Sequence, residues 1–194
     1  ATISLDLRTD PLYQYQWHLN NTGQTNFASL AGTAGMDINV DTQIVSGKTG
    51  AGVKVAVVDS GLELLHEDLA PNIISGSRDF LNSDNDPSPT SAGGDHGTSV
   101  AGIIGAVGWN NVGVRGVAPS VSMKGFNYLS STTTANLVSS IGGETYSSDI
   151  DIFNFSAQTY SRTFFENNST TKNIYKSTLP SLRSGKGGIF VKSA

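Results

Sequence analysis

A short apolar run from Val53 to Val58 gives the clearest structural signal in this chain. It reads V-K-V-A-V-V, and a run of mostly β-branched and small apolar residues is typical of a central parallel strand buried on both faces. The run ends in Asp59-Ser60-Gly61. Because open α/β sheets carry their sites at the carboxyl ends of the strands, the pattern predicts a buried strand that places Asp59 at a functional edge.

A helical pattern begins near His96, which lies among the helix-start residues of D-H-G-T-S. Apolar residues then recur at helical spacing, namely Val100, Ile103, Ile104 and Val107. We expect a helix that buries this face. We also expect the glycines at positions 102, 105 and 108 to lie where the helix approaches other backbone closely.

The remaining segments alternate between strand-like and helix-like patterns. Helices are expected over residues 40–46, 134–142 and 173–183, and strands over residues 117–126, 150–155 and 188–192. This alternation predicts an α/β fold, with a doubly wound, mostly parallel sheet and helices on both faces. Residues 1–35 are polar and broken by proline and glycine, with an amphipathic patch around Trp17, and we interpret them as an arm packed on the domain.

Composition narrows the class of protein. With 194 residues the chain can form one sizeable core, and a net charge of −4 does not favour nucleic-acid binding. No apolar run approaches the ~20 residues of a membrane span, and the amino terminus has no signal-peptide core. The absence of cysteine excludes disulfides, a thiol nucleophile and thiolate metal sites.

Asp59 and His96 are the candidate catalytic residues. An aspartate that orients and compensates an imidazole forms the base half of a nucleophilic triad, and the predicted sheet edge allows the two side chains to meet. A helix amino terminus disfavours imidazolium, whereas a carboxylate favours it, so the histidine can cycle its proton. Each residue alone also has an ordinary explanation, Asp59 as a cap and His96 as a structural hydrogen-bond donor.

Two motifs resemble those of a known family. The segments Val57-Val-Asp-Ser-Gly61 and His96-Gly-Thr-Ser-Val-Ala-Gly102 resemble the aspartate and histidine motifs of the subtilisin-like serine proteases, in the order found in subtilisin. The resemblance extends over roughly residues 9–194 and points to the kexin and furin-like branch. The further segments that carry it are Thr9-Asp-Pro11 with Gln16-Trp17, His66-Glu-Asp-Leu69, Gly116-Val-Ala-Pro119 and Gly188-Ile-Phe-Val191.

The resemblance implies a subtilisin-like fold and a secreted bacterial serine endopeptidase. Residues 36–194 would be the amino-terminal part of its catalytic domain, incomplete at the carboxyl-terminal side. A serine would attack the peptide carbonyl, His96 would take its proton, and Asp59 would hold His96 in the right tautomer. The family's serine and oxyanion asparagine are not found in the 194 residues, which alone should be inactive.

The resemblance also implies partners. These would be polypeptide substrates, a propeptide or dedicated chaperone, and the rest of the catalytic domain. The alternative is a catalytically dead subtilase-like domain that binds a peptide, propeptide or chaperone along the same edge. Glycine and asparagine followed by a G-T-S-type serine beyond Ala194 would favour the enzyme.

By the same resemblance, the chain is expected to bind one Ca²⁺. The ligands would be the side chains of Asp10, Asp68 and Asn110 and the carbonyls of Val107, Val112 and Val114. Such an oxygen set suits calcium, which would tie the arm to the core. Without the resemblance, the two aspartates would be ordinary turn acids and Asn110 a loop cap.

Substrate binding is expected at the ends of two strands. The resemblance places substrate backbone beside Asn127-Tyr128-Leu129 and Ser156-Ala157-Gln158, where a peptide pairs by main-chain hydrogen bonds. These segments would otherwise be two loop ends. The acidic positions with which convertases bind basic residues are uncharged here, which weighs against strict dibasic specificity; they are Ser60, Ser130, Thr132 and Ala135.

Overall fold

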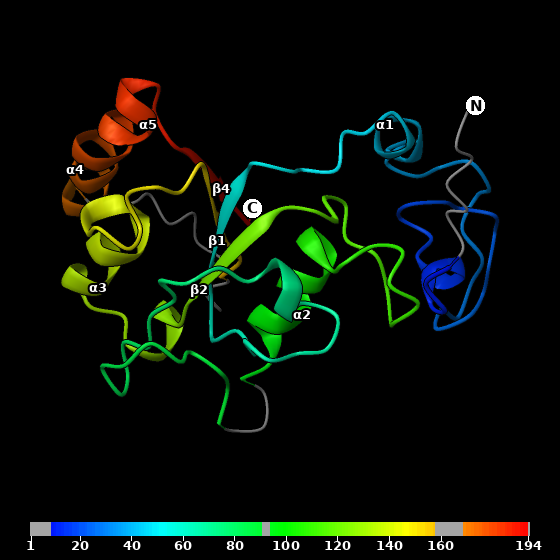
Figure 1. Cartoon of the computed structure of the whole chain (residues 1–194), viewed down its shortest axis with the longest axis horizontal. Coiled ribbons are helices and arrows are strands. Elements are labelled where there is room, and N and C mark those ends of the chain that lie inside the picture. Colours follow the sequence, from blue (N-terminus) through cyan, green and yellow to red (C-terminus); the bar gives the residue numbers. More distant parts are fainter. Residues whose placement is uncertain (1–8, 91–93, 158–168, 194) are drawn as a thin grey trace. The chain divides into compact units, whose positions relative to one another are not determined.

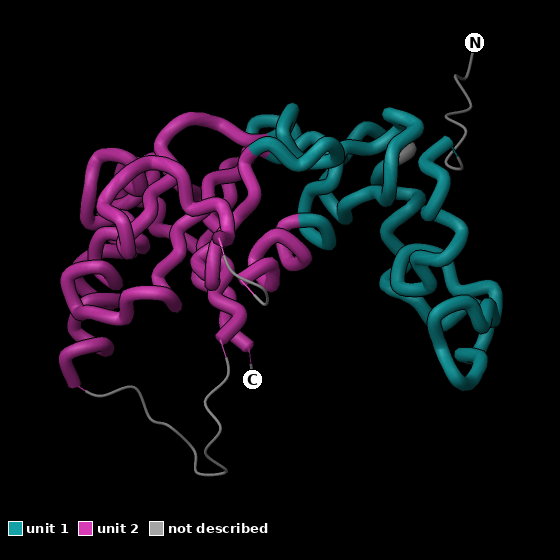
Figure 2. Tube along the Cα trace, turned by 90° about the horizontal axis from the view of Figure 1, so that it is seen from below, with its two compact units in different colours: residues 1–52, 65–72, 102–121 teal, residues 53–64, 73–101, 122–194 magenta. Residues whose placement is uncertain are grey.

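The structure is a computed structural model that describes residues 9–90, 94–157 and 169–193, without the side chain of Val45. The chain divides into two compact units, coloured separately in Figure 2. Unit 1 comprises residues 1–52, 65–72 and 102–121, and unit 2 comprises residues 53–64, 73–101 and 122–194. Each is described by itself. The expected boundary between an arm and a domain at residue 35 stays a prediction.

Unit 2 is built on a parallel sheet. Its strands are β1 (Lys54–Val58), β2 (Ser122–Phe126), β3 (Ile152–Phe155) and β4 (Ile189–Lys192). They lie in the order β2-β1-β3-β4, and every neighbouring pair is parallel. Strands β1 and β2 are labelled side by side in Figure 1. The parallel sheet and its central strand are therefore confirmed.

The core of unit 2 lies where strand β1 meets the helices. Ala56 and Val58 are fully buried and pack in one cluster with Phe126, Phe153 and Ile150. Helices α3 (Thr134–Val138) and α5 (Leu182–Gly185) add one buried leucine each. Each fully buried large apolar side chain contributes about 1.5–3 kcal/mol, so this cluster fixes the strand that ends at Asp59.

Two expected helices differ in extent. The expected helix over residues 134–142 is α3 followed by a wide turn, η4 (Ser139–Gly143), which contains Gly142 at a φ of 100°. The helix expected over residues 173–183 begins earlier, as α4 (Ser169–Thr178), and breaks into η5 (Leu179–Ser181) and α5 at Pro180. The shorter elements reflect glycine and proline inside apolar patterns.

Strand β2 is shorter than expected. Residues 117–126 were expected to form one strand, but β2 begins only at Ser122. The amides of Val117 and Ala118 donate instead to the carbonyls of Ile103 and Ile104, at 3.0 and 2.8 Å. The backbone of this segment is therefore satisfied by the end of a helix and not by the sheet.

Helix α2 (His96–Gly105) is present, but its expected buried face is wrong. Ile103 is 56% exposed, whereas Ala101 is fully buried. A Cβ at Gly97 would lie 2.1 Å from the Gly61 carbonyl oxygen, so the helix packs through small residues at close range. The periodicity of apolar residues alone cannot reveal which face of α2 is buried, because either the small residues or the large apolar residues could form the packed face.

The expectation for the α2 glycines holds in part. A Cβ on Gly116 would lie 2.5 Å from the Cα of Gly105, and a Cβ on Gly108 would lie 2.9 Å from the Arg115 side chain. These two positions of the pattern do lie at close approaches. Gly102 does not, because a Cβ there would meet nothing within 4 Å.

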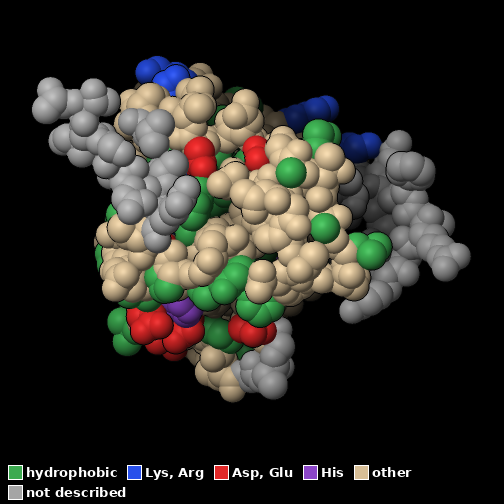
Figure 3. All heavy atoms as spheres, turned by 90° about the vertical axis from the view of Figure 1, so that its right-hand side faces the viewer, with side chains coloured by type: hydrophobic (Ala, Val, Ile, Leu, Met, Phe, Trp, Pro, Cys, Tyr) green, Lys and Arg blue, Asp and Glu red, His purple; other side chains and the backbone are tan. Residues whose placement is uncertain are grey.

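Unit 1 holds η1 (Tyr13–Tyr15), α1 (Asp41–Val45) and η2 (Ala70–Asn72) among long loops. Tyr13, Gln16 and Leu19 are buried at a spacing of three, as suits the 3-10 turn at η1. Trp17 between them is 55% exposed. Exposed hydrophobic side chains are coloured green in Figure 3, which shows one face of the molecule. The helix expected over residues 40–46 is confirmed as α1.

Within the described ranges, none of the helices has the length and hydrophobicity to cross a bilayer.

Candidate active site and metal-binding loop

The end of strand β1 places Asp59 beside His96 at the start of α2. Asp59 is fully buried, and its amide donates to the Phe126 carbonyl at 2.9 Å. The Leu129 amide donates in turn to the Asp59 carbonyl at 3.0 Å. Main-chain bonds on both sides therefore fix the backbone of Asp59 at the end of the strand.

The two candidate catalytic side chains are in direct contact. His96 Nδ1 lies 2.7 Å from Asp59 Oδ1, within unit 2. The aspartate side chain is 0% exposed, whereas the imidazole is 56% exposed. The aspartate therefore anchors one ring nitrogen, and the ring remains accessible to a reacting group. A proton on Nδ1 would leave Nε2 as the proton acceptor.

The Asp59 carboxylate is unevenly satisfied. Oδ1 also accepts a hydrogen bond from the Ser60 amide at 2.6 Å, whereas Oδ2 is buried and has no hydrogen-bond partner among the residues that the structure describes. A buried carboxylate with an unpaired oxygen is poorly solvated, which favours a nearby positive charge. This arrangement suits an imidazole that becomes charged during a reaction.

Short polar contacts hold the two segments of the site together. Ser60 Oγ donates to the Gly94 carbonyl at 2.9 Å, and Ser130 Oγ donates to the Ser60 carbonyl at 3.0 Å. A Cβ at Gly97 would also lie 2.8 Å from the Asp59 Cβ. Gly97 is therefore also a residue of the site, and its place directly after His96 in the histidine motif is the sequence signal for it. Because it has no side chain, the start of α2 can approach the end of β1 closely.

A cavity of about 80 Å³ opens beside this dyad in unit 2, and it is lined by Ser60, Gly94 and Ser130 among others. Asp79 is the one charged residue among the described lining residues, and it is only 3% exposed. Burial raises its pKa, but hydrogen bonds from Asn127, Asn82 and Leu81 outweigh this and lower the pKa overall. The only carboxylate among the described residues of the cavity wall is therefore already hydrogen-bonded within the protein.

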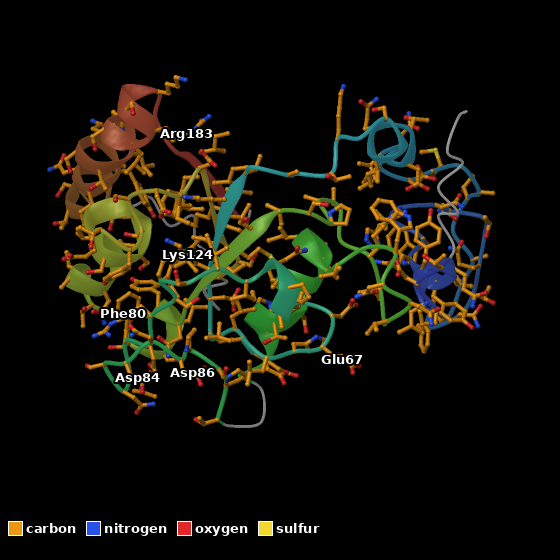
Figure 4. The ribbon with its side chains drawn as sticks, viewed as in Figure 1. Glu67, Phe80, Asp84, Asp86, Lys124 and Arg183 are labelled. Atoms are coloured by element: carbon orange, nitrogen blue, oxygen red, sulfur yellow. The ribbon has the colours of Figure 1, made fainter. Side chains whose placement is uncertain are left out.

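Asp79 is a site residue that the sequence did not reveal. Its Oδ1 accepts from Asn127 Nδ2 at 2.5 Å and from the Leu81 amide at 2.6 Å. The only sequence signal is an aspartate two residues before Leu81, as in an Asx turn. The neighbouring acids Asp84 and Asp86, labelled in Figure 4, lie in the same exposed loop.

The expected substrate-binding segments follow strands β2 and β3. Residues 127–129 form part of a 3-10 turn, η3 (Tyr128–Ser130), in which the Asn127 carbonyl accepts from the Ser130 amide at 3.0 Å. They are therefore not extended here, and their role stays a prediction. Ala157 accepts a hydrogen bond on its carbonyl from Ser193 Oγ at 2.5 Å, and Asn154 Nδ2 donates to Ser156 Oγ at 2.8 Å. Gln158 lies outside the described residues.

Two buried carboxylates of unit 1 meet the loop that follows α2. Asp10 is 1% exposed and accepts from the amides of Trp109 at 2.9 Å and Asn110 at 3.0 Å. Asp68 is 2% exposed and accepts from Asn110 Nδ2 and the Val114 amide, both at 2.8 Å. The three expected metal-binding side chains are thus brought to one loop.

The surroundings of Asp68 suit a cation. Burial is the largest effect and raises its pKa, and the negative charge of Asp10 raises it further against the hydrogen bonds from Asn110 and Val114. A cation between the two side chains would offset the negative charge that Asp10 places beside Asp68. A Cβ at Gly113, which has a φ of 43°, would lie 2.5 Å from Asp68 Oδ2, so this glycine is a further site residue.

The donor set favours a hard cation. The described ranges hold no group of three or more His, Cys, Asp or Glu side chains that could bind a metal, so an ion here would take several ligands from carbonyl oxygens. Mixed carboxylate, amide and carbonyl oxygens are typical of calcium. Val107, Val112 and Val114 lie in this loop, and the Val107 amide donates to the Asp68 carbonyl at 2.9 Å. Their carbonyls as ligands stay a prediction.

Comparison with known proteins identifies the class. The subtilase family profile matches residues 50–194, and the chain therefore belongs to the subtilase family. It is 41% identical over 148 residues to the extracellular serine protease of Aeromonas sobria, covering 75% of this chain and 24% of that relative. It is 34% identical over 195 aligned positions to neuroendocrine convertase 2 of Sus scrofa, covering 94% of this chain and 29% of that protein.

Solved structures agree with the fold. The serine protease of Aeromonas sobria superposes with a TM-score of 0.87 at 35% identity, over 95% of this chain and 32% of that chain. Its complex with a chaperone gives a TM-score of 0.86 at 34% identity, over 95% and 31% of the two chains. The subtilisin-like fold is therefore confirmed. The chain spans 24% and 29% of the two relatives compared by sequence, less than a third of their length.

Proposed function

We propose that the protein carrying this chain is a serine endopeptidase of the subtilisin and kexin type. The observation that carries the proposal is the 2.7 Å contact between His96 Nδ1 and the buried Asp59 carboxylate. Membership of the subtilase family supports the same activity. The nucleophilic serine and an oxyanion-binding asparagine would come from polypeptide outside these 194 residues.

In this mechanism His96 is the general base. Its Nε2 takes the proton of the attacking serine while Nδ1 keeps its hydrogen bond to Asp59, and the aspartate stabilises the imidazolium that forms. The proton then passes from Nε2 to the leaving amine. General acid–base catalysis of this kind contributes about a hundredfold to ten-thousandfold in rate.

The test uses the full-length protein and a peptide substrate. His96→Ala should lower kcat/KM by at least about 10³-fold, with the folded structure and melting temperature retained. Exposed Glu67, labelled in Figure 4, offers Glu67→Ala as a control that should leave kcat/KM unchanged. Full activity in His96→Ala would refute the proposed base.

The second candidate is a subtilase-like domain that binds polypeptide without cleaving it. The solved complex of a related protease with a chaperone shows that one relative engages a protein partner. A serine-directed fluorophosphonate separates the two functions. Labelling of the full-length protein supports the enzyme, and its failure together with retained peptide binding supports the binding domain.

The cavity beside the dyad supports cleavage next to uncharged residues. Its described lining offers neutral polar groups such as Ser60 and Ser130, and the carboxylate of Asp79 is already occupied by internal hydrogen bonds. A basic side chain would therefore gain no free carboxylate there. Sequencing the products of a peptide library should show no requirement for paired basic residues, and a strict dibasic pattern would contradict this specificity.

Calcium binding in unit 1 is part of the proposal. Asp10, Asp68 and Asn110 would hold the ion with the carbonyls of Val107, Val112 and Val114. A bound Ca²⁺ would neutralise the two buried carboxylates and so stabilise the fold. The melting temperature of the full-length protein should fall on addition of a chelator and recover with excess Ca²⁺. Asp68→Asn should remove most of that calcium-dependent shift.

The relatives also support a secreted protein with a chaperone partner. Two matches are named for Aeromonas proteases, one of them extracellular, and one related protease has been solved with a chaperone. A dedicated chaperone or propeptide would assist folding of the catalytic domain. Fractionation of the native host should recover the mature protein outside the cell, and retention in the cytoplasm would contradict this assignment.

A further inference from the structure

Arg115 occupies an unusual position for a charged residue. Its side chain is 0% exposed, within unit 1. The guanidinium forms an ion pair with Asp41 of α1, with Nη2 at 2.5 Å from Oδ1. Its Nε and Nη1 are buried and have no hydrogen-bond partner among the described residues. Burying a charge is costly unless it is well paired, so the placement needs a compensating role.

Two aromatic rings flank the guanidinium. Its Cζ lies 4.5 Å from the centroid of the Tyr13 ring and 5.5 Å from that of Trp109. Cation–π contacts with desolvated guanidinium groups are strong, and the planar group fixes the positions of both rings. Arg115 thus connects η1 of the arm to Trp109 in the loop after α2.

The main chain of Arg115 is held as firmly as its side chain. Its amide donates to Gln16 Oε1 at 2.9 Å, and its carbonyl accepts from Gln16 Nε2 at 2.9 Å. The Tyr13 hydroxyl donates to the same Asp41 carboxylate that pairs with the guanidinium. The arm, helix α1 and the loop are therefore joined at one residue.

The residues that Arg115 holds are those that hold the two metal-site carboxylates. Trp109, at a φ of 61°, donates its amide to Asp10 Oδ2 at 2.9 Å. Val114, the residue before Arg115, donates its amide to Asp68 Oδ2 at 2.8 Å. Left-handed backbone at a residue such as Trp109 persists when the surroundings fix it. A shift of either neighbour would move a hydrogen bond to one of the carboxylates.

We infer that Arg115 is a positioning residue for the calcium site of unit 1, because it fixes the loop that presents both carboxylates. This inference rests on the proposed calcium binding. When Arg115 holds the loop in place, the ion binds a loop that is already ordered. Without Arg115, the free-energy cost of ordering the loop would be subtracted from the binding energy. Loss of residues that orient metal ligands typically weakens affinity by about 10- to 100-fold.

The sign of the effect separates positioning from simple charge. A positive guanidinium in unit 1 repels Ca²⁺, so removing the charge alone would tighten binding. Loss of positioning weakens binding. Arg115→Met, which keeps much of the apolar length and removes the planar charge, should therefore raise the Kd for Ca²⁺ at least about tenfold. An unchanged or lower Kd would overturn the inference.

The experiment titrates Ca²⁺ into the metal-depleted full-length protein by isothermal calorimetry. Arg115→Lys keeps the charge without the planar stack, so its Kd should also rise. Gln16→Ala provides a second perturbation if Arg115→Met does not fold: it removes both hydrogen bonds to the Arg115 main chain without changing any charge, and it too should weaken binding. An unchanged Kd in both milder variants would overturn the inference.

A destabilising control lies in unit 2. Asp149→Asn breaks an ion pair with Lys124 and should lower the melting temperature without changing the Kd for Ca²⁺. If this control weakens binding as much as the Arg115 variants, the effect reflects general destabilisation and the inference fails. Absence of binding by the unsubstituted protein would instead refute the calcium proposal itself, so the two failures are distinguishable.

Discussion

One carboxylate of unit 2 binds two lysines of very different exposure, and its removal gives a sharp prediction. Asp149 Oδ1 lies 2.7 Å from Nζ of Lys124, whose side chain is 5% exposed. Asp149 Oδ2 lies 2.7 Å from Nζ of Lys54, whose side chain is 40% exposed. Lys124, labelled in Figure 4, is on β2 and also donates to the Tyr146 carbonyl at 2.7 Å.

The magnitude follows from the burial of Lys124. Breaking a buried pair costs about 3–5 kcal/mol, but Asp149 is 40% exposed and Lys124 keeps its bond to Tyr146, so about 2 kcal/mol is expected for Asp149→Ala. The exposed pair should matter less, and Lys54→Ala should cost under about 1 kcal/mol. Urea denaturation of the full-length variants at pH 7 measures both free energies of unfolding.

The pH dependence has a definite sign. Burial raises the pKa of Asp149, but hydrogen bonds from Lys124 and Lys54 outweigh it and lower the pKa overall. A lowered pKa in the folded state gives stability that is present above the unfolded pKa of about 3.9 and is lost as pH falls through the folded value. The difference between the unsubstituted protein and Asp149→Ala should therefore shrink below about pH 4. Equal losses for Asp149→Ala and Lys54→Ala at pH 7 would refute the reasoning.

Three further substitutions test the sites more locally. Asp59→Asn should lower kcat/KM by about 10⁴-fold without loss of the fold, as measured by steady-state peptide hydrolysis, because the wrong imidazole tautomer would be held. Gly97→Ala should lower both the melting temperature and kcat/KM, because its Cβ would lie 2.1 Å from the Gly61 carbonyl oxygen; an unchanged melting temperature would contradict that contact. Gly113→Ala should reduce the calcium-dependent rise in melting temperature, since its Cβ would lie 2.5 Å from Asp68 Oδ2.

Local pattern was sufficient for the elements that carry the dyad. The apolar run before Asp59 predicts a strand buried on both faces, and the described β1 has Ala56 and Val58 fully buried. The start of a helix at His96 can also be predicted from the neighbouring residues, because capping and turn preferences act within a few residues. The contact between the two side chains needed the parallel topology as well.

The buried face of α2 shows why periodicity has a limit. Ile103 and Ala101 are both compatible with a core-facing stripe, but only Ala101 is buried. The choice is made by Gly61 and Gly97, whose backbones approach too closely for larger side chains between helix and strand. Such a choice depends on a partner 36 positions away in the sequence, which a window along the helix does not include.

The burial of Arg115 is likewise not predictable from the sequence around it. An arginine in a loop of glycine and valine is expected to be solvated, since charged residues are almost never fully buried without a partner. Its hydrogen-bonding partners Gln16 and Asp41 and the ring of Tyr13 are each more than 70 positions earlier in the sequence. The one nearby partner is the ring of Trp109, and a single tryptophan six positions away does not signal that the arginine is buried. The aspartates of the proposed calcium site are different, because Asp10 and Asp68 belong to short motifs that the family resemblance makes visible. Candidate ligands can therefore be proposed from motifs, whereas residues such as Arg115 that fix the geometry of the loop become apparent only from tertiary contacts.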